Sequence, residues 1–174
     1  MFVDIRGFTA LAEKSAPREV ADRLSHFYRL ATNAIFRYDG TLDKLVGDQV
    51  MAFFGAPVQW HDHPQRAVRT AVEIMRGVSE LAGEDALKVG AAVATGEAFV
   101  GNVGESAVKD FTVLGDTVNV AARLQGAAAP GEILLTEETY AAVEPQFPAA
   151  PRRELELKGK SEPVVARVIV GRRA

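Results

Sequence analysis

The chain has 174 residues, 48 % of them hydrophobic, which is enough for one domain with a continuous core. Its 20 basic and 23 acidic residues give a formal charge of −3, and this near balance argues against binding nucleic acid or a membrane surface through bulk charge. The lack of cysteine excludes disulfides, thiolate catalysis and cysteine-ligated zinc. No segment approaches the ~20 apolar residues of a membrane-spanning helix, so we expect a soluble, cytoplasmic protein.

The amino-terminal run Met1–Ile5 predicts a strand that turns through Gly7. Only three residues precede Asp4, whereas strands average ~5–6 residues. We therefore expect this strand to be cut short and the chain to be a fragment of a longer protein. Regulatory segments, and any attachment to a membrane, would then lie upstream.

Two long amphipathic helices are predicted, from Pro17 to Tyr38 and from about His63 to Ala82, because apolar residues recur there at spacings of three and four. The other predicted elements are a hairpin of 41–46 and 48–54, strands at 87–94 and 97–103 joined at Thr95-Gly96, a strand at 111–114, a helix from 116 to about 125, a strand at 132–135, a helix at 137–143, and strands at 154–157 and 164–170. In this order the two long helices can cover one face of a largely antiparallel sheet, which predicts an α+β fold rather than a doubly wound one.

Two aspartates, Asp4 and Asp48, each lie at the end of an apolar run beside a glycine, and Asp48 shares a tight turn with Gly47. Carboxylates at strand ends are suited to hold a pair of hard divalent cations, which lie roughly 3.5–4 Å apart when they clamp a transferring phosphoryl group. The residues alone therefore predict phosphate chemistry.

The predicted helix after Leu114 carries Asn119 and Arg123 four residues apart, so these side chains are neighbours on one side of it. A solvated polar face is one interpretation of this pair. The other is an amide and a guanidinium that project together into a site, where the planar guanidinium can donate two hydrogen bonds to phosphate oxygens.

Three segments, residues 2–9, 44–48 and 111–124, resemble in order and spacing the three signature blocks of the class III nucleotidyl cyclases. The resemblance covers about residues 1–135, and the tail at 157–160 is similar to the closing hairpin of that family. It implies that residues 1–174 form one catalytic domain with a ferredoxin-like βαββαβ core.

The resemblance also implies a role for each matching residue on the metal and phosphate side. Asp4, Asp48 and the backbone carbonyl of Ile5 would hold two Mg²⁺ or Mn²⁺ ions. The backbone N–H groups around Gly7, Phe8 and Thr9 would bind the β- and γ-phosphates. Lys158 matches a lysine that contacts the triphosphate.

On the nucleoside side, Lys44 and Thr112 match the positions that read the purine, Asn119 would orient the ribose, and Arg123 would stabilise charge at the α-phosphate. Guanylate cyclases of this family typically have glutamate and cysteine in place of Lys44 and Thr112. Lysine can only donate, which suits adenine N1 and not guanine N1–H. The resemblance thus implies an adenylate cyclase that converts ATP to cyclic AMP and pyrophosphate.

In this family each active site lies between two domains, with the metal carboxylates from one and the nucleoside-binding residues from the other. The chain has both sets, so the resemblance implies a homodimer with two shared sites. The alternatives are a catalytically silent nucleotide-binding module, a guanylate cyclase, or another palm-type enzyme such as a polymerase or diguanylate cyclase. The last is disfavoured because the chain has no Gly-Gly-Asp-Glu-Phe segment.

Overall fold

The structure, a computed structural model, describes residues 1–81, 87–105 and 109–171. Its strands are β1 (Phe2–Ile5), β2 (Thr41–Val46), β3 (Gln49–Phe53), β4 (Val89–Val93), β5 (Phe99–Val103), β6 (Asp110–Leu114), β7 (Glu132–Thr136), β8 (Arg152–Leu155) and β9 (Val164–Val170). Its helices are α1 (Phe8–Lys14), α2 (Pro17–Arg37), α3 (His63–Ser79), α4 (Asp116–Ala127) and α5 (Glu137–Val143), followed by a 3₁₀ turn, η2 (Glu144–Gln146).

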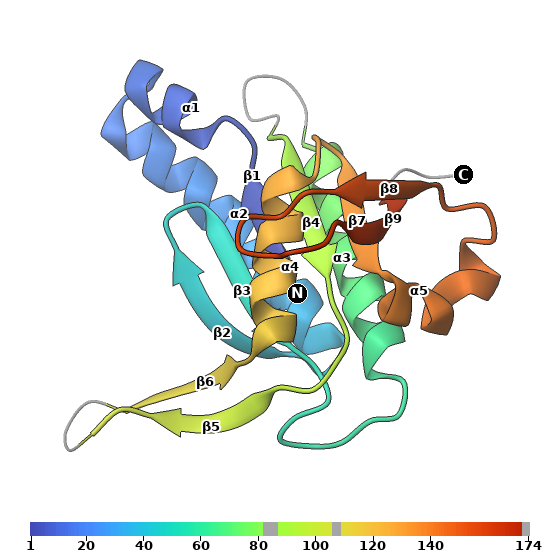
Figure 1. The fold of residues 1–174 in the computed structure, drawn as a ribbon. Coiled ribbons are helices and arrows are strands. Elements are labelled where there is room, and N and C mark those ends of the chain that lie inside the picture. The colour runs from blue at the N-terminus through green and yellow to red at the C-terminus, as the bar shows by residue number, and fades with distance from the viewer. Residues whose placement is uncertain (82–86, 106–108, 172–174) are drawn as a thin grey trace.

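Seven strands form one sheet in the order β2-β3-β1-β4-β7-β9-β8. Only the β4–β7 pair is parallel among the strand pairs of the described residues. Strands β5 and β6 form a separate antiparallel hairpin that projects from the body (Figure 1). The predicted α+β fold with a largely antiparallel sheet is confirmed.

Alternating side chains of the strands build a core on each face of the sheet. On one face, Val3, Val50 and Ile133 pack with Phe27 of α2 and Ile74 of α3, and α5 joins this cluster. The two long helices therefore cover one face, as predicted.

The opposite face is covered by α4, which crosses the sheet in front of β4 and β7 (Figure 1). Val120 and Leu124 of this helix pack against Ala92, Leu134 and Val168. All five residues of β4 are buried, because helices cover this strand on both sides. The sheet is thus the middle layer of three, and α4 lies alone on its second face among the described helices.

Most predicted elements are present, with several differences. Strand β8 spans Arg152–Leu155, whereas 154–157 was predicted, and the 3₁₀ turn η2 was not predicted. Helix α1 was not predicted, because none of its residues is buried and it therefore shows no apolar periodicity. Helix α3 ends at Ser79, before the predicted end at Ala82, which lies outside the described residues. The two strands predicted on either side of Thr95-Gly96 do not pair: β4 belongs to the main sheet and β5 pairs with β6. Among the described residues, no helix is both long enough and apolar enough to span a membrane.

The packing of α4 generates a stability prediction. Leu124 is completely buried between this helix and the sheet, so Leu124→Ala should lower the free energy of unfolding by about 2–5 kcal/mol through lost burial and the cavity left behind. Urea unfolding followed by circular dichroism measures the change. Val58, 57 % exposed, is the matched control, and Val58→Ala should change the free energy by about 0.5 kcal/mol or less. Equal losses for the two variants would contradict this account of the second core.

Candidate active site

The end of β1 and the β2–β3 turn bring Asp4 and Asp48 into one region. Asp4 is paired with Gln49 of β3 and with Gly90 of β4, and the backbone N–H of Ile5 donates to the Asp48 carbonyl at 3.3 Å. The turn needs Gly47, whose φ of 59° is left-handed. The Tyr28 hydroxyl of α2 donates to the Gly47 carbonyl and so holds the turn against the body.

Burial and the charge of Asp48 both raise the pKa of Asp4 above its ordinary value, burial being the larger cause. The Arg6 guanidinium, 3.7 Å from the Asp4 carboxylate, and a hydrogen bond with Gln125 act in the opposite direction but do not cancel the rise. Asp4 and Asp48 repel each other, and Arg6 neutralises this negative charge only in part. The two carboxylates are therefore suited to be ligands of a divalent cation. No third His, Cys, Asp or Glu completes a cluster with them in the described ranges, and Mg²⁺ commonly takes one or two carboxylates, the rest of its shell coming from water and substrate phosphates.

The predicted phosphate-binding residues lie where β1 passes into α1. Gly7 has a left-handed φ of 74° and is the N-cap of α1, and it provides no side-chain cap. Phe8 and Thr9 form the first turn of the helix. The N–H groups of this turn therefore follow Asp4 by three to five residues in the chain.

Lys44 of β2 and Thr112 of β6 are brought together by a residue that the sequence analysis did not select, Asp43. The Asp43 carboxylate accepts from Lys44 Nζ at 2.9 Å on one oxygen, and from Thr112 Oγ1 at 2.7 Å on the other. Lys44 also donates to Asp110. Hydrogen bonds to Asp110 and then Asp43 raise the pKa of Lys44, so the side chain stays an ammonium and only donates.

Helix α4 carries the remaining nucleoside-side residues. Asn119 is exposed and Arg123 is half-buried. The turn that contains Gly159 lies over Arg123, because a Cβ at Gly159 would be 3.3 Å from Arg123 Nη2. In the same turn Lys160 donates to Asp116 of α4 at 2.5 Å, whereas Lys158 is exposed. The turn at residues 157–160 therefore contacts α4 beside Arg123.

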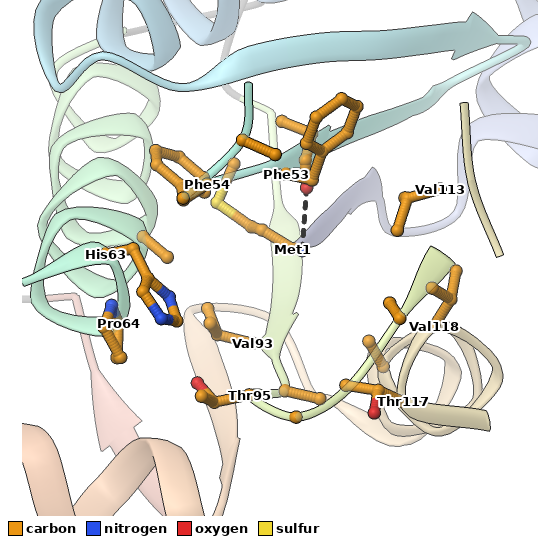
Figure 2. Close-up of a pocket in the computed structure, with 18 of the residues that line it drawn as sticks. Met1, Phe53, Phe54, His63, Pro64, Val93, Thr95, Val113, Thr117 and Val118 are labelled. Atoms are coloured by element: carbon orange, nitrogen blue, oxygen red, sulfur yellow. Dashed lines mark hydrogen bonds between the residues drawn. The ribbon is translucent and has the colours of Figure 1, made fainter. Parts of the chain in front are cut away.

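The predicted site residues lie apart from the cavity that is drawn in Figure 2. The cavity drawn in Figure 2 lies between Phe53 and Phe54 on one side and Thr95, Thr117 and Val118 on the other. None of the predicted site residues lines it. Asp4 and Asp48 lie together at the end of β1 and the β2–β3 turn, Lys44 and Thr112 are joined through Asp43, and Asn119 and Arg123 lie on α4.

A family model described as the adenylate and guanylate cyclase catalytic domain matches residues 1–169. The chain belongs to this family. The cyclase domain is similar to "Adenylate cyclase 1" of Rhizobium meliloti (strain 1021), with 36 % identity over 132 residues, 72 % of this chain and 20 % of that protein. The chain spans 20–39 % of the length of such curated relatives.

Among solved structures, the guanylyl cyclase Cya2 matches this cyclase domain with a TM-score of 0.87 and 29 % identity, covering 96 % of this chain and 88 % of that one. The adenylyl cyclase CyaB from P. aeruginosa matches with a TM-score of 0.81 and 32 % identity, covering 99 % and 93 %. Both base specificities therefore occur among its neighbours, and the preference of this cyclase domain has to be argued from its own residues.

Asp43 is the residue of the nucleoside side that sequence reasoning missed. A signal was present, because aspartate is disfavoured in strands and Asp43 interrupts the run Thr41–Val46. Its partners Thr112 and Val113 are distant in the chain, however, so the sequence did not reveal what it binds.

The repulsion between Asp4 and Asp48 generates a prediction for the metal-free cyclase domain. Asp48→Asn should stabilise it at pH 7 by about 0.5 kcal/mol, which is a rise of about 1–2 °C in the midpoint of thermal unfolding. A carboxyl whose pKa is raised by folding costs stability when ionised, and this cost disappears as the pH falls through the raised pKa. The gain should therefore shrink in acid, where Asp4 of the wild type is protonated.

Differential scanning fluorimetry between pH 3.5 and 8 measures this effect, with Asp22→Asn on the exposed side of α2 as the control that should change little. A second scan with Mn²⁺ should raise the midpoint of the wild type and leave that of Asp48→Asn nearly unchanged. A lower unfolding midpoint for metal-free Asp48→Asn than for the wild type at pH 7 would show that the two carboxylates do not repel each other.

Proposed function

We propose that the chain is an adenylate cyclase domain, which converts ATP to 3′,5′-cyclic AMP and pyrophosphate in intracellular signal transduction. The observation that carries the base assignment is the joint placement of Lys44 and Thr112 on one buried carboxylate. The Lys44 ammonium can donate to adenine N1, but guanine carries a hydrogen at N1 and cannot accept. We assign all 174 residues to this one domain, of which 82–86, 106–108 and 172–174 lie outside the described residues.

The reaction forms a bond between the ribose 3′ oxygen and the α-phosphorus and breaks the bond to pyrophosphate. Asp4, Asp48 and the Ile5 carbonyl would hold two Mg²⁺ or Mn²⁺ ions, in a family whose domains generally depend on divalent metal. When bound, such ions lower the pKa of the attacking hydroxyl and neutralise charge on the phosphates.

The chain's own groups position the substrate. The N–H groups of Gly7, Phe8 and Thr9 bind the β- and γ-phosphates, and Lys158 contacts the triphosphate. Asn119 orients the ribose. Arg123 donates to the α-phosphate oxygens, where negative charge increases in the transition state.

The active form is a homodimer with two shared sites. Two features support it: the chain carries both the metal carboxylates and the nucleoside-side residues, and the β5–β6 hairpin exposes apolar side chains. By register Phe99, Val103 and Leu114 lie on one face of the hairpin, and they are 56 %, 37 % and 49 % exposed. Exposed apolar patches of this kind commonly mark an interface, and a second copy of the chain would cover this one.

The base assignment is tested by the substrate itself. The wild-type domain should cyclise ATP with a kcat/KM at least tenfold above that for GTP, because a donor that faces guanine N1–H leaves both groups unpaired. Cyclic nucleotide formation with Mn²⁺ is measured by chromatography for both substrates. Preference for GTP would assign a guanylate cyclase, and tight binding of ATP without product would assign a silent nucleotide-binding module.

The shared site is tested by mixing inactive variants. Asp48→Ala and Arg123→Ala should each be inactive, and their mixture should recover about a quarter of wild-type activity, since random exchange makes half the dimers mixed and each mixed dimer has one intact site. The matched control mixes Asp48→Ala with Asp4→Ala, which damage the same half and should not complement. No recovery in the first mixture, with mixed dimers demonstrated by two affinity tags, would contradict the shared-site dimer.

A further inference from the structure

Asp43 lies at a β-bulge on the edge strand of the sheet. Leu42 is paired with Ala52 and Lys44 with Met51, so Asp43 is the extra residue that has no partner on β3. In a regular strand neighbouring side chains point to opposite faces. A bulge re-aims a side chain, and here it allows Asp43 and Lys44 to bond to each other.

The Asp43 side chain is fully buried (0 % exposed) and its carboxylate is satisfied by three donors. One oxygen accepts from Lys44 Nζ. The other accepts from Thr112 Oγ1 at 2.7 Å and from the Val113 backbone N–H at 3.2 Å. The same carboxylate therefore connects the edge strand β2 to β6 and touches both side chains proposed to read the base.

The bond between Thr112 and Asp43 decides what the Thr112 hydroxyl can do. A hydroxyl has one hydrogen, and a carboxylate only accepts, so this hydrogen is directed at Asp43. Thr112 is 6 % exposed, and water competes little for the bond. The remaining capacity of the Thr112 oxygen is to accept a hydrogen bond, which suits the exocyclic amino group of adenine and opposes the 6-keto oxygen of hypoxanthine or guanine.

We propose that Asp43 is the positioning residue that sets base choice, because it turns Thr112 into an acceptor beside the donor Lys44. This inference rests on the proposed function, since it concerns how that site distinguishes ATP. Lys44 and Thr112 touch the base, and Asp43 acts only through them. The pattern of one donor and one acceptor then matches N1 and the 6-amino group of adenine, and it mismatches both groups of a 6-keto purine.

The experiment compares ATP with ITP, whose base differs from adenine only in the N1–H and 6-keto groups. The ratio of kcat/KM values, and the ratio of dissociation constants for the noncyclisable 3′-deoxy forms, are measured for each variant. Asp43→Ala should lower the preference for ATP by about tenfold, because the Thr112 hydroxyl is then free to turn and donate. Thr112→Val should do the same without disturbing Asp43 burial, and Thr112→Ser should keep the wild-type ratio.

Two further variants separate this role from a merely structural one. Asp110→Asn removes the other carboxylate that binds Lys44 but does not touch Thr112, so its ratio should stay within about twofold of the wild type. The double variant Asp43→Ala/Thr112→Val should lose no more preference than either single variant, since both act on the same hydroxyl.

The outcomes distinguish the two proposals. A wild type that prefers ITP or GTP overturns the adenylate assignment and the acceptor role of Thr112 with it. Suppose instead that the wild type prefers ATP, that the unfolding midpoint shows Asp43→Ala to be folded, and that this variant keeps the preference for ATP. This result overturns the Asp43 inference alone. Losses that add in the double variant also overturn it, and so does a preference unchanged by Thr112→Val.

Discussion

The central sheet of this domain is buried on both faces, and this burial limits where charged side chains can lie. Helices α2 and α3 cover one face and α4 the other, and all five residues of β4 are buried between them. Burial of an unpaired charge is too costly for such an interior. Charged side chains of the strands therefore lie at strand ends, on the edge strands β2 and β8, on the projecting hairpin or, for Arg167 of β9, in an ion pair with Glu137. Asp4 lies at the end of β1 but is still partly buried, and this burial raises its pKa.

The one fully buried carboxylate of the nucleoside side, Asp43, lies at that edge and is paired with three donors. It joins β2, which carries Lys44, to β6, whose hairpin presents Phe99 and Leu114 outward. The groups proposed to read the base and the hairpin proposed to meet a second copy are therefore connected through Asp43.

Periodicity predicted α2 and α3 well because each buries one apolar stripe, and it missed α1 because nothing there is buried. Thr95-Gly96 correctly predicted the end of β4 but not the partner of β5, because strand pairing depends on residues that are distant in the sequence. The family blocks selected Asp4, Asp48, Lys44 and Thr112, and the fold brings each pair together. Asp43 was not predicted, because its role depends on the bulge in the β2–β3 pairing and on contacts with β6, which is distant in the chain.

We propose that each active site takes its metal carboxylates from one copy of the chain and its nucleoside-binding groups from another. A crystal structure of the domain with Mn²⁺ and 3′-deoxy-ATP, which cannot cyclise, tests it most directly. We expect a dimer in which the phosphates and metal lie at Asp4 and Asp48 of one copy while the adenine and ribose contact Lys44, Thr112 and Asn119 of the other copy. A nucleotide held entirely by the residues of one copy would contradict it.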